Sequence, residues 1–293
     1  RARSPNQQST TCHTTPAIQY WSPLITVTHT VVIGNGYTGQ RVLKLIPENA
    51  ATGISRQTLD LDKSNDEQIE VPTPYSVLYT VPPRSDSQGE PRIQAFLPLL
   101  KTSPQRVVYL STSGVYGNRN GEIVCEKDPP SPETPRAKNR LIAETMWTDW
   151  CQREKVALVI LRIPGIYGPG RLGLHKIEAR VPVIREEEAN PSNRIHVDDL
   201  AACCVRALDE STPPGIYNVG DGAHHSSTWF ANTVARLATL EPPPQVPRTE
   251  AKAAFGAARV SFLNESRILD TTRMLKVLGF TPRYTDPEQG IAA

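Results

Sequence analysis

The sequence predicts an α/β fold: a doubly wound parallel sheet followed by a small C-terminal lobe. Two observations lead to this prediction. Strand-like apolar runs alternate with helical segments along most of the 293 residues, a pattern typical of βαβ units and a parallel sheet. The first of these runs also leads directly into glycines at positions 34, 36 and 39, which is typical of a tight turn from a strand into a helix.

Runs rich in apolar and β-branched residues are expected to form the main strands. They cover residues 29–33, 51–55, 76–81, 106–111, 156–162 and 215–219. The run 106–111 is nearly continuous in apolar residues, as expected for a parallel strand that is covered by helices on both faces.

Three segments between or after these runs are expected to be helical. Residues 135–154 form the longest, with Leu141, Ile142, Met146 and Trp147 on its buried side. Residues 200–208 form an apolar helix that contains Cys203 and Cys204 as packing residues. Residues 270–278 form a helix that ends at Gly279.

The chain divides by composition into three parts. Residues 1–28 are rich in Ser, Thr, Pro and Gln, and we expect a flexible extension outside the fold. Residues 29–167 form the sheet domain, to which residues 195–220 return. Residues 168–194 and 221–293 form the small lobe that shapes a substrate pocket.

Composition excludes several function classes. The net charge is +2 and no basic block is interleaved with aromatic residues, so nucleic acid is not an expected partner. No apolar stretch is long enough to span a bilayer. The five cysteines form no CxxC pair and have no histidines at zinc-ligand spacing, so we expect reduced thiols, no metal and a cytoplasmic protein.

The segment Gly34-Asn35-Gly36-Tyr37-Thr38-Gly39 has the spacing that holds a dinucleotide pyrophosphate in a Rossmann-type fold. The first glycine permits the sharp turn, the second lets the backbone approach the phosphates, and the third allows close packing of helix on strand. The following helix would direct its amide donors at the anion.

The end of the second strand predicts which dinucleotide binds. An acid at this edge would bind a ribose hydroxyl and repel a 2′-phosphate, whereas Ser55 and Arg56 supply a hydroxyl and a cation that suit the phosphate. The sequence therefore favours NADP over NAD. The alternative is that Arg56 is a solvated arginine at the end of a strand, and NAD remains open.

Several further motifs occur in a fixed order, within residues 109–117, 161–168, 195–201 and 215–220. With the glycine turn, they resemble the short-chain dehydrogenase/reductase superfamily in its extended form, the NAD-dependent epimerase/dehydratase family. This resemblance implies that Ser111 and Thr112 lie at the nicotinamide end of the cofactor. It also implies that Pro164 and Ile166 pack beside the nicotinamide ring, and that a homodimer forms.

The chain departs from the family pattern at the catalytic positions. Extended members place their first glycine one residue earlier, where this chain has Ile33, and their Tyr-x-x-x-Lys pair is absent. Alignment puts Arg136 in the tyrosine position and Arg140 in the lysine position, which resembles the atypical branch of the superfamily. Arg140 can donate to ribose hydroxyls, but a guanidinium is a poor general acid near neutral pH.

Other residues must then supply the catalytic groups. Thr112 can orient a carbonyl or hydroxyl oxygen by hydrogen bonding. Tyr116 and Tyr167 are candidates for the proton donor, and each is equally compatible with aromatic packing. Arg171 could meet an anionic substrate or be an exposed loop residue.

The histidine of the Ile195–Ala201 motif stands beside two acids. His196, Asp198 and Asp199 could suggest a metal site or a general base. We expect a structural role instead, with one aspartate capping the helix that follows.

Two functions are compatible with these residues. The first is an NADP(H)-binding oxidoreductase or epimerase of the atypical type, acting on a carbonyl, an alcohol or a sugar-like small molecule. The alternative is a non-catalytic NAD(P)-binding sensor or regulatory module that has lost the Tyr/Lys pair.

Overall fold

The computed structural model describes residues 28–63, 68–84, 89–250 and 265–293, together with residues 253, 255 and 260. The predicted N-terminal extension lies outside these described residues except for Thr28, and so does Cys12.

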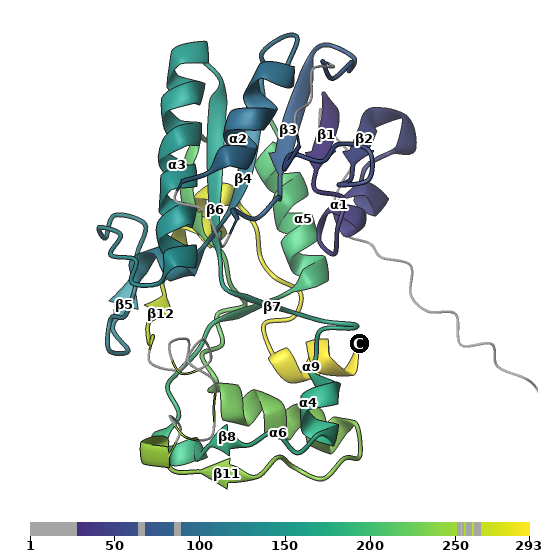
Figure 1. Cartoon of the computed structure of the whole chain (residues 1–293). Helices are drawn as coiled ribbons and strands as arrows, with labels where there is room; N and C mark the ends of the chain where they lie inside the picture. Colours follow the sequence, from purple (N-terminus) through teal and green to yellow (C-terminus); the bar gives the residue numbers. More distant parts are fainter. Residues whose placement is uncertain are drawn as a thin grey trace, which may run out of the picture.

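A six-stranded parallel sheet forms one half of the molecule (Figure 1). Each predicted run becomes one strand, with ends that shift by at most two residues. The strands are β1 (His29–Ile33), β2 (Ala51–Ile54), β3 (Tyr75–Tyr79), β4 (Arg106–Thr112), β6 (Ala157–Ile163) and β10 (Gly215–Asn218). Their order is β10-β6-β4-β3-β1-β2, and every neighbouring pair is parallel.

The strand order changes direction at β1, because β2 lies on one side of it and β3 on the other. In open α/β sheets a ligand binds at this switch point, outside the carboxyl ends of the strands. The chain leaves the carboxyl end of β1 directly into Gly34. A typical Rossmann sheet carries a further strand beyond β2, whereas β2 is the edge strand among the residues described here.

Helices cover both faces of the sheet. On one face, α1 (Gly39–Leu45) and α5 (Val197–Leu208) share an apolar core that includes Val42, Val108 and Leu200. On the other, α2 (Pro91–Phe96) and α3 (Pro135–Glu154) share a core that includes Phe96 and Trp147. The predicted doubly wound α/β architecture is confirmed.

Helix α3 has the predicted ends, but part of its predicted buried side is wrong. Trp147 is fully buried, whereas the Ile142 side chain is 40% exposed. Three polar residues, Asn139, Arg140 and Glu144, occupy the buried side of the helix. An apolar periodicity could not locate that face correctly, because Glu144 is paired with Arg162 inside the protein and Arg140 donates to the Leu110 carbonyl.

The remaining chain forms a lobe below the sheet in Figure 1, with α9 (Pro287–Ala292) beside it. Its regular elements are α4 (Leu174–Glu178), β8 (Val183–Ile184), α6 (Ser227–Leu237) and β11 (Gln245–Val246). Two short strands, β7 (Gly165–Tyr167) and β9 (Arg194–His196), pair between this lobe and the sheet. Short 3₁₀ turns lie at Glu48–Ala50, Leu97–Leu99, Ser113–Tyr116, Glu186–Glu188 and Arg248–Glu250.

Part of the segment that we expected in the lobe returns to the sheet domain. Strand β12 (Ile268–Leu269) pairs with β5 (Ile123–Val124). The next turn, Met274–Leu278, is a π-helix rather than an α-helix, and it ends at Gly279 with φ +68° as the sequence predicts. Met274 and Leu278 pack in the same core as α5.

The four cysteines in the described part of the chain are free, and Cys203 and Cys204 are completely buried on α5. Both pack in the apolar core, as predicted. None of the helices in the described ranges combines the length and the hydropathy that a bilayer crossing requires.

Candidate functional site

A cleft of about 1380 Å³ runs along the carboxyl edge of the sheet. Ligand pockets commonly occupy about 300–1,000 Å³, so this cleft has room for an elongated ligand. It brings together most of the residues predicted for the site: Gly34, Asn35, Gly36, Tyr37, Thr38, Ser55, Arg56, Ser111, Thr112, Arg136, Arg140, Pro164 and Ile166. Gly39 and Tyr116 are predicted site residues that do not line it.

The three glycines of the turn have different surroundings. Gly34 has φ +95°, and a β-carbon there would overlap the Thr80 hydroxyl. A β-carbon on Gly39 would lie 2.5 Å from the Gly34 carbonyl oxygen. A β-carbon on Gly36 would have no protein atom within 4 Å. Gly34 and Gly39 are therefore needed by the turn itself, whereas Gly36 leaves open space in the cleft.

Tyr37 connects the glycine turn to the loop that begins the lobe. Its hydroxyl donates to the Pro169 carbonyl at 2.9 Å. The guanidinium groups of Arg41 and Arg171 lie 4.1 and 4.0 Å from the centre of its ring, as cation–π contacts. Because Arg171 also lines the cleft, this contact places a cation beside the glycine turn.

The end of β2 carries the predicted cation together with acids that sequence reasoning missed. Arg56 is 71% exposed and pairs with Asp62 at 3.1 Å and Asp60 at 3.4 Å. Asp62 also accepts two hydrogen bonds from Arg92, at 2.6 and 2.8 Å, and these lower the pKa of its carboxyl. The alternation Leu59-Asp60-Leu61-Asp62 could have indicated that both acids face one side.

Ser111 lies at the cleft, but its hydroxyl is already engaged. It donates a short hydrogen bond to Glu144, which forms an ion pair with Arg162 at 2.7 Å. All three side chains are buried. Glu144 and Arg162 were missed by sequence reasoning, although a charge inside the apolar strand β6 and another on the buried side of α3 are the signal that could have found them.

Thr112 and Arg140 lie on the same part of the cleft wall. The Thr112 hydroxyl accepts from the Gly114 amide at 3.2 Å, which leaves its own proton available for donation. Arg140 is 7% exposed, and its Nη1 donates to the Leu110 carbonyl at 2.6 Å and to the Tyr109 hydroxyl at 3.3 Å. Its Nε has no hydrogen-bond partner in the described chain.

The structure removes Tyr116 from the candidate proton donors. Its side chain is fully buried, its hydroxyl donates to Asn218 at 2.7 Å, and burial raises its pKa. Arg162 lies 4.8 Å from the centre of its ring. Tyr167 is also buried with a raised pKa and does not line the cleft. Of the tyrosines that the structure describes, Tyr37 alone lines it.

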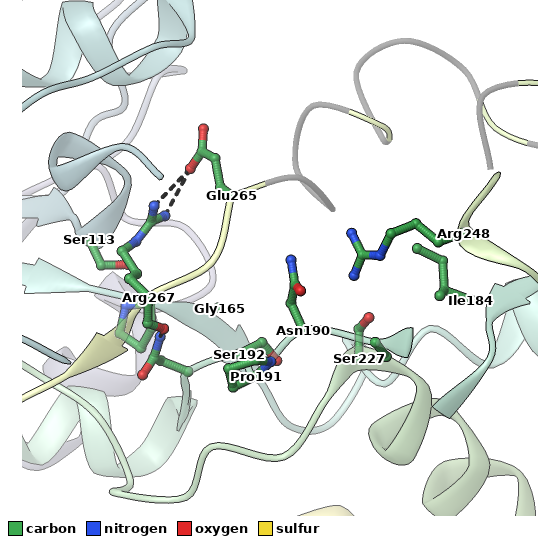
Figure 2. A pocket seen from close by; sticks show the side chains of 13 residues that line it. Ser113, Gly165, Ile184, Asn190, Pro191, Ser192, Ser227, Arg248, Glu265 and Arg267 are labelled. Atoms are coloured by element: carbon green, nitrogen blue, oxygen red, sulfur yellow. Dashed lines mark hydrogen bonds and ion pairs between the residues drawn. The ribbon is translucent and has the colours of Figure 1, made fainter. Parts of the chain in front are cut away.

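A smaller hollow of about 70 Å³ continues from the cleft toward the lobe (Figure 2). The two share Ser113, Pro164, Gly165, Glu265 and Arg267. On one side Arg267 pairs with Glu265 at 2.9 Å, and on the other side lies Arg248, from the lobe. A ligand that passes Thr112 can thus extend between the sheet domain and the lobe.

The predicted structural role of His196 and its acidic neighbours takes a different form. His196 itself caps α5, because its Nδ1 accepts from the Asp198 amide at 3.2 Å, so the predicted aspartate cap is wrong. Asp199 instead accepts from the Arg283 and Tyr284 amides, each at 2.9 Å, and holds the C-terminal segment. Within the described residues, no group of three or more metal-ligating side chains is found.

A switch-point cleft behind a glycine turn is the place where α/β proteins of the Rossmann type bind dinucleotides. Residues 95–220 match the family described as NAD dependent epimerase/dehydratase. The resemblance predicted from the motifs is therefore confirmed over residues 95–220. The glycine turn precedes the matched segment, which agrees with its departure from the family pattern at Ile33.

Relatives and solved structures extend this comparison. The chain is 27% identical over 218 residues to protein YeeZ of Escherichia coli K12, which covers 72% of both chains. The structure of a functionally unknown conserved protein from Silicibacter pomeroyi has a TM-score of 0.75 at 24% identity, covering 90% of this chain and 97% of that one. RMD from Pseudomonas aeruginosa, complexed with NADPH, has a TM-score of 0.68 at 15% identity, with 90% and 98% covered.

Proposed function

We propose that this protein is an NADP(H)-dependent oxidoreductase or epimerase of the atypical short-chain dehydrogenase type. Its substrate would be a small carbonyl, alcohol or sugar-like compound. The single observation that carries the proposal is the open space at Gly36 within a tight glycine turn at the switch point, since a bound pyrophosphate requires that approach. In this account, Gly34 to Thr38 hold the pyrophosphate, while Gly39 supports the turn from behind.

The proposed preference for NADP rests on Arg56 at the end of β2, because the neighbouring acids Asp60 and Asp62 would by themselves repel a 2′-phosphate. Arg56 is exposed and lines the cleft beside Ser55. Its partner Asp62 already receives two hydrogen bonds from Arg92. Arg56 can therefore turn to a 2′-phosphate without leaving that carboxylate unpaired.

The catalytic residues act on the substrate oxygen and on the ribose. The reduced cofactor, when bound, would supply a hydride to a carbonyl carbon. Thr112 would donate its hydroxyl proton in a hydrogen bond to the substrate oxygen, and Arg140 would hold the ribose beside Pro164 and Ile166. Since Tyr116 is buried and positions 136 and 140 are arginines, the proton that completes an alcohol would come from water in the open cleft.

A sugar-like substrate is supported by the family and by its solved neighbours. One neighbour of TM-score 0.67 and 21% identity, MoeE5, was solved in complex with UDP-glucose and NAD. In this chain the substrate would lie at Thr112 and extend toward Ser113 and the hollow bounded by Arg248 (Figure 2). The homodimer and the cytoplasmic location stay predictions.

Cofactor titration followed by a substrate screen tests the proposal. Purified protein is titrated with NADPH and NADH, and aldehydes, ketones and nucleotide sugars are then screened for oxidation of the bound cofactor. We expect NADPH binding and substrate-dependent turnover that Thr112→Ala removes and Thr112→Ser retains. Thr145→Ala, an exposed change on α3, is the control. Failure to bind either cofactor would reject the proposal, and tight binding without turnover would favour the sensor.

A further inference from the structure

The first two turns of α3 place two arginines on the wall of the cleft. Thr134 caps this 20-residue helix by accepting from the Ala137 amide at 3.2 Å. Arg136 and Arg140 follow at a spacing of four residues, so they lie on the same face of the helix. Both line the cleft, together with Thr134, Pro135 and Ala137.

This arrangement is electrostatically unfavourable for the protein alone. The N-terminus of a helix carries a partial positive charge, so cations there are destabilising. The first turn of α3 contains no acid. Partial desolvation and the neighbouring charge of Arg140 lower the pKa of Arg136, although much of its side chain stays exposed. A charge placed unfavourably at a helix end, with no acid in that turn to offset it, is expected mainly at functional sites.

The acids nearest to this pair are otherwise engaged. Glu144 is bound to Arg162 and Ser111, and Glu133 accepts from the Asn118 amide. Glu90 caps α2 by accepting from the Arg92 amide. Burial raises the pKa of its carboxyl, and the charge of Arg140 opposes this shift. In the described ranges neither Arg136 nor Arg140 forms an ion pair, and the acid that interacts electrostatically with Arg140 is Glu90.

The helix start also offers a backbone donor. Pro135 has no N–H and the Ala137 amide is bound to Thr134, so the Arg136 amide is the first helix donor without a partner in the helix. This end of α3 lies next to the turn that follows Thr112. A β-carbon built on Gly114 would be 3.4 Å from the Thr112 hydroxyl and 3.8 Å from the Ala137 β-carbon.

We propose that Arg136 and the start of α3, with the positive charge of Arg140 behind them, form an oxyanion site that binds a carboxylate or phosphate group of the substrate beside the carbon held at Thr112. Planar guanidinium groups bind both kinds of oxyanion well. The inference rests on the proposed function, because it takes the Thr112 side of the cleft as the substrate side. It narrows the substrate to an anionic hydroxy or oxo compound.

Calorimetric titration with malonate and with inorganic phosphate tests this site, on the protein alone and on the protein saturated with NADPH. We expect at least one of the two anions to bind the wild-type protein in both states. Its affinity for Arg136→Gln should be at least tenfold lower. Its affinity for the control Lys138→Gln, an exposed change in the same turn, should be unchanged. Arg136→Lys should recover part of the affinity. NADPH affinity should change less than twofold in Arg136→Gln, and its melting temperature should be equal or higher, since a repulsive charge is removed.

Three results would overturn the inference. The first is that neither probe binds the wild-type protein. The second is that Arg136→Gln binds both probes as well as the wild type does. The third is that saturating NADPH abolishes the binding, which would assign the arginines to a phosphate of the cofactor. Failure of NADPH to bind would reject the proposed function separately, because the titrations of the protein alone still measure the oxyanion site.

Discussion

Glu144 on α3 and Arg162 on β6 form an ion pair inside the protein, with 2.7 Å between Glu144 Oε2 and Arg162 Nη2 and side chains that are 5% and 3% exposed. The same carboxylate accepts from Ser111, the residue before Thr112. The pair therefore fixes the end of β4, which carries Thr112, relative to the helix that carries Arg136 and Arg140.

Removing one partner of this pair should destabilise the fold strongly. Glu144→Ala leaves the Arg162 charge buried and unpaired, which we expect to cost about 3–5 kcal/mol of unfolding free energy. Urea denaturation measures it, with Asp149→Ala, an exposed acid on the same helix, as the control. The double change Glu144→Leu with Arg162→Met should recover most of the loss. Equal stabilities of Glu144→Ala and the control would contradict this account of the pair.

Asp221 should make stability fall as the pH rises. Burial raises the pKa of its carboxyl to about 7, while Arg194 opposes and Asp199 adds to the shift. One of its oxygens has no hydrogen-bond partner in the described chain. The unfolded carboxyl titrates at about 3.9, so between roughly pH 4 and 7 the folded state binds more protons than the unfolded state, and the unfolding free energy decreases over this window.

The change Asp221→Asn isolates this effect, because it keeps the oxygen that accepts from the Ala223 amide. We expect the variant to melt at a higher temperature than the wild type at pH 8 and at the same temperature at pH 4. Thermal melts across this range provide the measurement, with Asp149→Asn as the exposed control. A constant difference between Asp221→Asn and the wild type at every pH would contradict the raised pKa of Asp221.

Arg56 should determine the choice between the two nicotinamide cofactors. A hydrogen bond to a charged group contributes about 1.5–3 kcal/mol, so Arg56→Gln should weaken NADPH binding by about tenfold to a hundredfold. NADH affinity should change by less than about threefold, since NADH lacks the 2′-phosphate. Fluorescence titration of both cofactors measures the ratio, and Lys63→Gln controls for general charge. Equal losses for NADPH and NADH would assign Arg56 to a structural role with Asp60 and Asp62.

Much of the sheet could be predicted from the sequence, because parallel strands that are buried on both faces leave short apolar runs between helical segments. The glycine turn could be predicted for a similar reason, since Gly34 and Gly39 meet steric limits that only glycine satisfies. The strand order could not be read from the runs, because the connection from β2 to β3 depends on tertiary packing.

The polar interior was harder to predict than the apolar one. Glu144, Arg162 and Asn218 are buried charged or amide groups whose partners lie far away in the sequence. A periodicity analysis treats such residues as exposed, and it therefore placed Ile142 inside. The motif that follows Ser111 and Thr112 makes Tyr116 a candidate proton donor in the sequence, but in the structure its hydroxyl is bound to Asn218.

The central claim is that a dinucleotide lies against the glycine turn, and Gly36→Val tests it most directly. The added side chain meets no protein atom within 4 Å at its β-carbon, so stability should change by less than about 0.5 kcal/mol, as for a surface substitution. Gly39→Ala, by contrast, should destabilise the fold, because its β-carbon would lie 2.5 Å from the Gly34 carbonyl oxygen. Calorimetric titration of folded Gly36→Val with NADPH should show binding reduced at least a hundredfold. Wild-type affinity for NADPH in that variant would contradict the account.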